Sequence, residues 1–442
     1  MINNNDTKFD IIIKRLTGIF LIILTLFFAF GNTVIGRKFF TINERGEIIS
    51  ALILSIIFCI LFFKKGEYKL FIKRNIFAIL YLVIRLALIF KLSFDYSTIR
   101  SAFFEAFFLI VISNDLLKGN NELIKKSTYL ITGINLALNA INLFLSWNIM
   151  RGYPIVSEQI VEKISLYGIK EVMPECTMYA NPNSLGIMSA FSILILAHLF
   201  QTKKPLVRIF SIIAIIFNLY CIYASQCRSA MVALLGCLVI YIFRLVVKNI
   251  DVRKITVAVM LICLIASLSI LGYAQKHRET GLNYYHITKE ENLIENMSSG
   301  RYLIWKTGLF AHEDTALLGT GSAKNEVNNR VKFIKDNFES GWTRYGNLGP
   351  HNGYLAMLWC SGILGSMLFF ASLLRKILNA RGLEIDSRYM IPIFVFVINM
   401  FESMFIVNRY FIVLYLFLIL SMSEDEEEVK NGLWTNFGWR NW

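Results

Sequence analysis

Charged residues and proline are scarce in this sequence. Only 17% of its 442 residues are charged and 6 are proline, whereas 56% are hydrophobic and 36 are phenylalanine. A soluble globular domain has about 25% charged residues. The composition therefore excludes an ordinary soluble domain and indicates a protein of the lipid bilayer.

Cysteine and histidine do not occur in metal-binding patterns. The 7 cysteines form no C-x-x-C pair and have no even spacing, and most lie in apolar runs, where a thiol acts as a small hydrophobe. Four histidines show no H-x-x-x-H or carboxylate spacing; they are His198, His277, His286 and His312. The sequence predicts no disulfide framework, no metal site and no cofactor.

Strand-like alternation of apolar and polar residues is also missing, which excludes a membrane β-barrel. Segments such as 16–30 and 255–273 are apolar on all sides and long enough to cross about 30 Å of hydrocarbon. We therefore predict an all-α integral membrane protein with a single polytopic domain over residues 1–442. About twelve spans are expected: 16–36, 47–63, 75–92, 99–117, 127–147, 183–200, 207–224, 229–247, 255–273, 353–374, 389–405 and 409–422.

The net charge of +14 would suggest nucleic acid as the partner of a soluble protein. Here the Lys/Arg excess follows the positive-inside rule, because alternate loops such as 64–75 are basic and the loops between them are poor in Lys and Arg. We therefore predict no nucleic-acid binding and place both termini in the cytoplasm. The tail 423–442, acidic and then aromatic, does not change this orientation, since Asp and Glu carry little weight in the rule. The first span lacks a small-residue cleavage site and is expected to stay uncleaved.

Two longer segments then lie outside the cytoplasm, at about 148–183 and 274–350. The second is far longer than a connection needs, and loops of this size are usually functional or disordered. Val327, Val331 and Ile334 recur in it with helical spacing, continued by Phe338. This stripe predicts an amphipathic helix that lies on protein or on the membrane surface.

A histidine and an asparagine stand at the outer end of the tenth span. His351 can be neutral or charged near pH 7, so it could take a proton from a hydroxyl or hold an anion, with Asn352 beside it. The alternative is a polar residue that only caps the helix at headgroup level. Gly362 and Gly365 on the same span form a small-x-x-small face that predicts close packing of a neighbouring helix.

Two arginines lie on the same side of the membrane. Arg228 sits in a very short connection, so its guanidinium, which matches phosphate in shape, must stay close to the bilayer. Arg301 lies at a helix start, where free N–H groups favour an anion. The alternatives are an arginine that snorkels to the interface and a solvated loop arginine. Arg85 and Glu105 lie within adjacent spans, and a buried ion pair is the simplest account of them.

Together these motifs resemble the bacterial O-antigen ligase and O-antigen polymerase family over about residues 175–370. The matching motifs are the Asn-Pro-Asn turn at 181–183, the Ser-x-x-Arg-Ser-Ala turn around Arg228, the Arg-aromatic-x-x-Trp start at Arg301, the Gly-x-Gly turn at 319–321, and the His-Asn pair at 351–352 with nine residues before the Gly-x-x-Gly of 362–365. The resemblance implies a membrane glycosyltransferase of the C-type superfamily. Its donor would be an undecaprenyl-diphosphate-linked glycan, and its nucleophile a hydroxyl of an acceptor sugar.

The resemblance also implies roles for individual residues. Arg228 and Arg301 would hold the diphosphate, and His351 would act on the acceptor hydroxyl as a base or as an orienting group, with Asn352 in support. Two arginines can neutralise the phosphates without a metal ion. The residues expected to line the site are Asn181, Asn183, Tyr302 and Trp305.

Several functions remain open at this point. Within the family, a polymerase uses another lipid-linked repeat unit as acceptor, whereas a ligase uses a lipid A core or another acceptor. We favour a polymerase of O-antigen, capsular or exopolysaccharide type in the cytoplasmic membrane, with an extracytoplasmic active site. A flippase or transporter is the alternative from another class, although its charges should spread along a central cavity. The expected partners are the bilayer and the chain-length regulator and flippase of the same pathway.

Overall fold

The computed structural model describes residues 8–31, 33, 39–66, 68–92, 94–112, 121–150, 179, 182–200, 205–247, 251–276, 293, 295, 298, 301–337, 348–380, 389–405 and 411–421. Within these ranges the secondary structure is helical, apart from one isolated bridge between Thr33 and Tyr179. The helices are α1 (Lys8–Gly31), α3 (Phe40–Lys65), α4 (Tyr68–Leu92), α5 (Tyr96–Ala106), η1 (Phe107–Ile112), α6 (Asn121–Met150), α8 (Pro182–Phe200), α9 (Pro205–Ser225), α10 (Arg228–Val246), α11 (Val252–Lys276), α13 (Arg301–Ala311), η4 (Glu313–Thr315), α14 (Ala323–Asn337), α16 (Gly353–Asn379), α17 (Met390–Ile398) and α18 (Phe411–Ser421).

Seven of these helices are long and apolar enough to cross a membrane. They contain the segments Ile12–Gly31, Thr41–Lys64, Tyr68–Leu92, Pro205–Ser225, Arg228–Val246, Val252–Lys276 and Gly353–Asn379. Two shorter apolar helical segments, Tyr129–Phe144 and Pro182–His198, lie at other predicted spans. The prediction of an all-α, multi-pass membrane protein is thus confirmed, while the count of twelve spans stays a prediction.

The predicted span 389–405 is wrong as one continuous helix. Its helical part, α17, has 9 residues and rises about 14 Å at 1.5 Å per residue, which is less than half of the hydrocarbon thickness. The chain then turns at 399–405, where the side-chain oxygen of Asn399 accepts hydrogen bonds from the N–H groups of Met404 and Phe405. This turn carries Glu402, which contributes to the candidate site described below.

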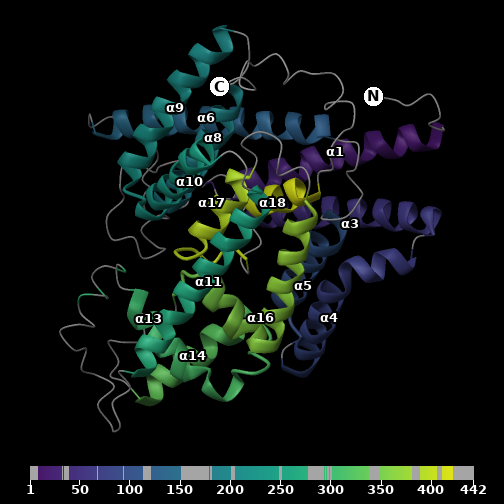
Figure 1. Ribbon diagram of the computed structural model, residues 1–442, viewed down its shortest axis with the longest axis vertical. Helices are drawn as coiled ribbons and strands as arrows, with labels where there is room; N and C mark the ends of the chain where they lie inside the picture. The colour runs from purple at the N-terminus through teal and green to yellow at the C-terminus, as the bar shows by residue number, and fades with distance from the viewer. Residues whose placement is uncertain are drawn as a thin grey trace.

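The long segment between α11 and α16 contains two helices that pack together. Figure 1 shows α13 and α14 side by side, against the ends of α11 and α16 that lie farthest from α6 and α9. α14 lies where the apolar stripe predicts a helix, but Glu326, Arg330 and Ile334 are its fully buried residues. Phe338, the last residue of the predicted stripe, lies outside the described residues. The buried face of α14 is therefore held by a charged pair as well as by apolar contacts.

Helix α16 is interrupted at Gly362, which has φ of 66° and ψ of −178°. A turn formed by residues 316–321 fits into this interruption: the N–H groups of Thr320 and Gly321 donate to the carbonyls of Trp359 and Cys360. In return the N–H groups of Ile363 and Leu364 donate to the turn's own carbonyls. The turn thus satisfies backbone groups that the broken helix leaves unpaired.

Glycine is required at Gly362 for two reasons. Its positive φ is costly for any residue with a side chain, and a Cβ atom here would collide with the carbonyl oxygen of Leu317. The neighbour of Gly362 is therefore a turn and not the helix that the small-x-x-small spacing predicted. Gly365 faces Tyr81 of α4, so close helix packing does occur one turn further along α16.

Arg85 and Glu105 form the predicted ion pair between α4 and α5. Arg85 Nε lies 3.0 Å from Glu105 Oε2, and Tyr81 Oη donates to the same oxygen at 2.8 Å. Arg85 also donates to the carbonyl of Gly321 in the turn that fits into α16. Since both charges are paired and hydrogen-bonded, the cost of burying them is offset.

Candidate active site

A buried carboxylate, Glu402, connects the residues that the sequence singled out. Its Oε1 atom accepts a hydrogen bond from Asn183 Nδ2 at 2.8 Å and lies 3.3 Å from Arg301 Nη2. Its Oε2 atom lies 3.4 Å from His351 Nδ1. We call these four residues, Asn183, Arg301, His351 and Glu402, the Glu402 cluster. It joins the starts of α8 and α13, the residue before the cap of α16 and the turn after α17.

His351 is presented to the surface on a strained backbone. It has φ of 48°, an uncommon value for a residue other than glycine, and its side chain is 35% exposed. Such conformations persist only where the surroundings enforce them, and they occur often at active sites. The imidazole is thus the exposed member of the cluster beside the more buried Glu402.

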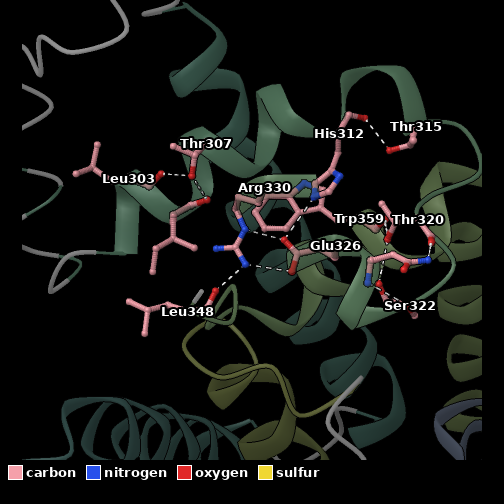
Figure 2. Close-up of polar contacts among 12 residues, drawn as sticks. Leu303, Thr307, His312, Thr315, Thr320, Ser322, Glu326, Arg330, Leu348 and Trp359 are labelled. Atoms are coloured by element: carbon pink, nitrogen blue, oxygen red, sulfur yellow. Dashed lines mark hydrogen bonds and ion pairs between the residues drawn. The ribbon is translucent and has the colours of Figure 1, made fainter. Parts of the chain in front are cut away.

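Hydrogen bonds hold the chain on both sides of His351. Before it, Trp305 Nε1 donates to the carbonyl of Pro350 at 2.7 Å, and Arg330 donates to that of Leu348 at 2.6 Å, a contact visible in Figure 2. After it, the N–H of Asn352 donates to Ser403 Oγ, and the N–H of Gly353 donates to the carbonyl of Asn399. Helices α13 and α14 and the turn after α17 therefore fix the position of the imidazole together.

Asn352 does not reach the surface of the site. It is fully buried and caps α16, because its Oδ1 atom accepts hydrogen bonds from the N–H groups of Tyr354 and Leu355. Its Nδ2 atom donates to Ser267 on α11 at 3.1 Å. The prediction that Asn352 supports His351 therefore needs a correction: its polar atoms are engaged within the protein, so its support is positional.

Arg301 begins α13, as predicted, but the N–H groups beside it are already in use. The N–H of Tyr302 donates to Ser298 Oγ, and that of Leu303 donates to a carboxylate oxygen of Glu295. Burial raises the pKa of this Glu295 carboxyl group. The guanidinium itself donates to the carbonyl of Phe401 at 2.6 Å and contacts Glu402, and it remains 18% exposed. An anion at this place would meet the guanidinium and not the helix N-terminus.

Arg228 starts α10 and is exposed, in the turn next to the Glu402 cluster. Its neighbour Cys227 donates to the carbonyl of Asn183, with sulfur and oxygen 3.8 Å apart. Burial raises the pKa of the Cys227 thiol, whereas hydrogen bonds with Ser229 and Ala230 lower it. The contact of Cys227 with Asn183 places this turn beside the Glu402 cluster. Within the described residues no hydrogen bond or ion pair fixes the Arg228 side chain, which leaves its guanidinium accessible to a ligand.

Two residues predicted to line the site instead pack behind it. Tyr302 is fully buried, and its ring meets that of Tyr273 edge to face with centroids 6.1 Å apart. Trp305 is 5% exposed and uses its indole N–H to hold Pro350. Asn183 contacts Glu402 as described above, and Asn181 lies outside the described residues.

Glu402 is a site residue that the sequence patterns did not predict. The signal that could have found it is its position in an otherwise apolar segment, since an ionisable residue within a predicted span is by default a functional candidate. Its partners lie 51, 101 and 219 residues away along the chain, so no local spacing connects them.

The geometry of the cluster could support proton transfer next to the positive charge of Arg301. If His351 Nδ1 carries a proton and donates a hydrogen bond to Glu402, the Nε2 atom has a free lone pair that can accept a proton from a substrate. A carboxylate in this position also stabilises the imidazolium that forms. Among the side chains that the structure describes, no group of three His, Cys, Asp or Glu residues could hold a metal ion.

A comparison with protein families finds a match for the part of the chain that contains most of these residues. A family model, Wzy_C, described as O-Antigen ligase, matches residues 213–370. The match covers less than half of the chain but includes Arg228, Arg301 and His351, whereas Asn183 and Glu402 lie outside it. Searches of curated proteins and of solved structures gave no significant match. The predicted resemblance to the O-antigen ligase and polymerase family is thereby confirmed for residues 213–370.

Proposed function

We propose, with residues 213–370 taken as a segment of O-antigen ligase type, that this protein is a membrane glycosyltransferase that polymerises lipid-linked oligosaccharide repeat units. The observation that carries the proposal is the Glu402 cluster. It joins a partly exposed imidazole and the guanidinium of Arg301 to a buried carboxylate, and Arg228 starts α10 nearby. The donor would be an undecaprenyl-diphosphate glycan.

In the proposed reaction the oxygen of an acceptor sugar hydroxyl attacks the anomeric carbon of the donor. The bond between this carbon and the diphosphate oxygen breaks, and the electron pair leaves with the undecaprenyl diphosphate. His351 Nε2 takes the hydroxyl proton, and Glu402 holds the resulting imidazolium through Nδ1. Arg228 and Arg301 stabilise the negative charge on the departing diphosphate. The proposed reaction needs no metal ion, because the two guanidinium groups supply the positive charge.

The proposed location is the cytoplasmic membrane, with both termini in the cytoplasm and the Glu402 cluster at the outer face. The basic loops 64–75 and 375–388 support this orientation. The bilayer supplies the lipid-linked donor laterally. The chain-length regulator and the flippase of the same pathway are the proposed partners.

A ligase is the second candidate, and the description of the matching family favours it. A ligase would transfer the glycan to a lipid A core or another acceptor and would form one product. A polymerase would add repeat units successively and form a ladder. The acceptor therefore distinguishes the two functions.

The proposal is tested with the purified full-length protein and a lipid-linked repeat unit, in the presence of a metal chelator and without nucleotide sugars. A ladder of products is expected for the wild type. Replacing His351, Arg228 or Arg301 by Ala should each reduce product formation by about 100-fold or more, while the variants still insert into the membrane. Arg45→Ala is the matched control, since Arg45 is an exposed arginine of α3 outside the cluster.

Different results would count against different parts of the proposal. Normal ladders from all three variants would reject the assigned site. A single product that forms only when a different acceptor is added would reject the polymerase in favour of the ligase. Loss of the ladder on chelation, with recovery on adding a divalent cation, would reject the metal-free reaction.

A further inference from the structure

A pocket lies apart from the Glu402 cluster, between α11, α13, the 316–321 turn and α16. Its volume is about 220 Å³. The residues that line it are Leu271, Gln275, Leu309, His312, Glu313, Thr315, Ala316, Leu358, Trp359 and Ile363. We call it the lateral pocket.

Buried side chains with several contacts form the inner wall of the lateral pocket. His312 and Trp359 are each 3% exposed, and their ring centroids lie 5.6 Å apart. Figure 2 shows His312 pointing toward Glu326, which in turn pairs with Arg330. His312 Nε2 lies 3.4 Å from Glu326 Oε1, and Arg330 donates to both carboxylate oxygens at 2.9 and 3.1 Å. This buried charged group fixes one side of the pocket.

The rim of the lateral pocket is apolar and exposed. Ile363, which lines the pocket, is an exposed apolar side chain, as are Leu364 beside it and Leu317 and Leu318 next to the lining residue Ala316. Exposed apolar side chains gathered in this way suit an interaction site. Because α11 and α16 are both candidate membrane spans, we expect the hydrocarbon of the bilayer to lie next to these side chains.

We propose that the lateral pocket binds one acyl chain of a bilayer phospholipid, which enters sideways between α11 and α16. Five of the ten lining residues are leucine, isoleucine or tryptophan and a sixth is alanine. Such a wall favours a hydrocarbon over a sugar, which needs many hydrogen bonds. An apolar cavity of about 150 Å³ binds a ligand of the size of benzene. The lateral pocket is larger and accommodates a segment of a chain whose remainder stays in the bilayer.

An acyl chain at this place would brace the interruption of α16. Ala316 and Ile363, which both line the pocket, are joined by a backbone hydrogen bond of 2.9 Å across that interruption. The chain would pack against the two residues together and would fill the space beside the turn. The lateral pocket shares no residue with the Glu402 cluster, so its test does not require the proposed reaction to be correct.

The test uses the fluorescence of Trp359 in nanodiscs of phosphatidylglycerol brominated at the middle of its acyl chains, since bromine quenches a nearby indole. The Trp359 signal is the difference between the full-length protein and its Trp359→Phe variant. Ala316→Phe places a ring in the pocket, whereas Leu317→Phe adds a ring on the same turn at a residue that does not line it. We expect strong quenching of Trp359 in the wild type and in Leu317→Phe, and loss of this quenching in Ala316→Phe.

A second measurement does not depend on the Trp359 variant. Native mass spectrometry of the protein released from phosphatidylglycerol nanodiscs should find a retained phospholipid in the wild type and none in Ala316→Phe. Equal quenching in wild type and Ala316→Phe, or no retained phospholipid in the wild type, would overturn the proposal. His312 Nδ1 has no hydrogen-bond partner among the described residues and would suit a hydroxyl group. Retention of a polyprenol or a glycolipid instead of phospholipid would therefore also overturn it.

Discussion

Glu402 carries more of the candidate site than any other residue. A carboxylate that is 7% exposed beside apolar helices would be costly without partners, but it accepts hydrogen bonds from Asn183 and Arg301 and faces His351. Arg301 pairs with one oxygen of the carboxylate, and the other oxygen faces the imidazole of His351. The contacts within the cluster thus offset the free-energy cost of burying the Glu402 carboxylate.

Replacing Glu402 by Gln removes the charge and keeps the size of the side chain. We expect transfer of glycan to fall by about 100-fold or more, because His351 loses the acceptor that holds its Nδ1–H and stabilises the imidazolium. The rate of product formation in the purified system measures the effect. Glu313→Gln, at an exposed glutamate on the same side of the molecule, is the control and should keep the wild-type rate.

A wild-type rate in Glu402→Gln would remove the carboxylate from the mechanism. Loss of activity together with loss of folded protein would point to a role in stability alone. Thermal unfolding of the purified variant distinguishes this case from a loss of chemistry in a folded protein.

The sequence predicted some members of this cluster and not others. His351 and Arg301 could be found because titratable or charged residues next to predicted spans stand out in an apolar sequence. Glu402 was not identified because its segment was interpreted as one helix, and hydropathy does not detect the turn that begins at Asn399. Asn352 was interpreted chemically, although asparagine before an apolar helix is equally a signal for an N-cap.

Among the elements, the contact between the 316–321 turn and α16 fixes the position of α13 and α14, the helices on either side of the turn. Gly319 and Gly362 both have positive φ, and a Cβ atom on either would collide with the backbone of the other segment. Arg85 reaches the same turn from α4 and binds the carbonyl of Gly321. The turn therefore connects α4, α13, α14 and α16 near one point.

Gly362→Ala tests this contact. We expect the variant to be less stable by about 2 kcal/mol or more. The left-handed backbone conformation is unfavourable for alanine, and its Cβ atom would collide with the carbonyl oxygen of Leu317. Thermal unfolding in detergent measures the change. Gly272→Ala on α11 is the matched control, since nothing lies within 4 Å of its Cβ position and alanine favours a helix. Equal melting temperatures for both variants would contradict the close contact at Gly362.

Elements follow from the sequence only where hydropathy dominates. The long apolar runs gave the seven candidate spans, because length and composition are sufficient to identify them. The Gly362 and Gly365 spacing suggested two helices in contact, yet the interruption depends on a turn that lies more than forty residues earlier in the chain. Pairing between distant segments leaves no periodic pattern, so neither the interruption nor the Arg85 contact to Gly321 could be predicted.

At the scale of the whole molecule, the candidate site is formed by segments from both halves of the chain, and these segments must lie on the same side of the membrane. Asn183, Arg301, His351 and Glu402 lie at the ends of four different helices, and hydrogen bonds and ion pairs join them at one place. Arg228 starts a fifth helix, next to Cys227, which contacts Asn183. Such convergence at helix ends fits chemistry at a membrane surface better than a transport path, whose polar residues would spread along the spans.

The orientation of the molecule can be measured by labelling single cysteines with a membrane-impermeant maleimide. The background is a variant with Cys59→Ser and Cys176→Ser, which removes the exposed cysteine of α3 and the one in the predicted outer segment 148–183. Asp314→Cys, at an exposed residue after α13, should be labelled in intact cells, whereas Lys69→Cys near the start of α4 should be labelled only after the membrane is permeabilised. Both sites are exposed, so a difference in labelling reports the side of the membrane and not burial. The reverse pattern would put the Glu402 cluster in the cytoplasm, where a glycan delivered to the outer leaflet could not reach it.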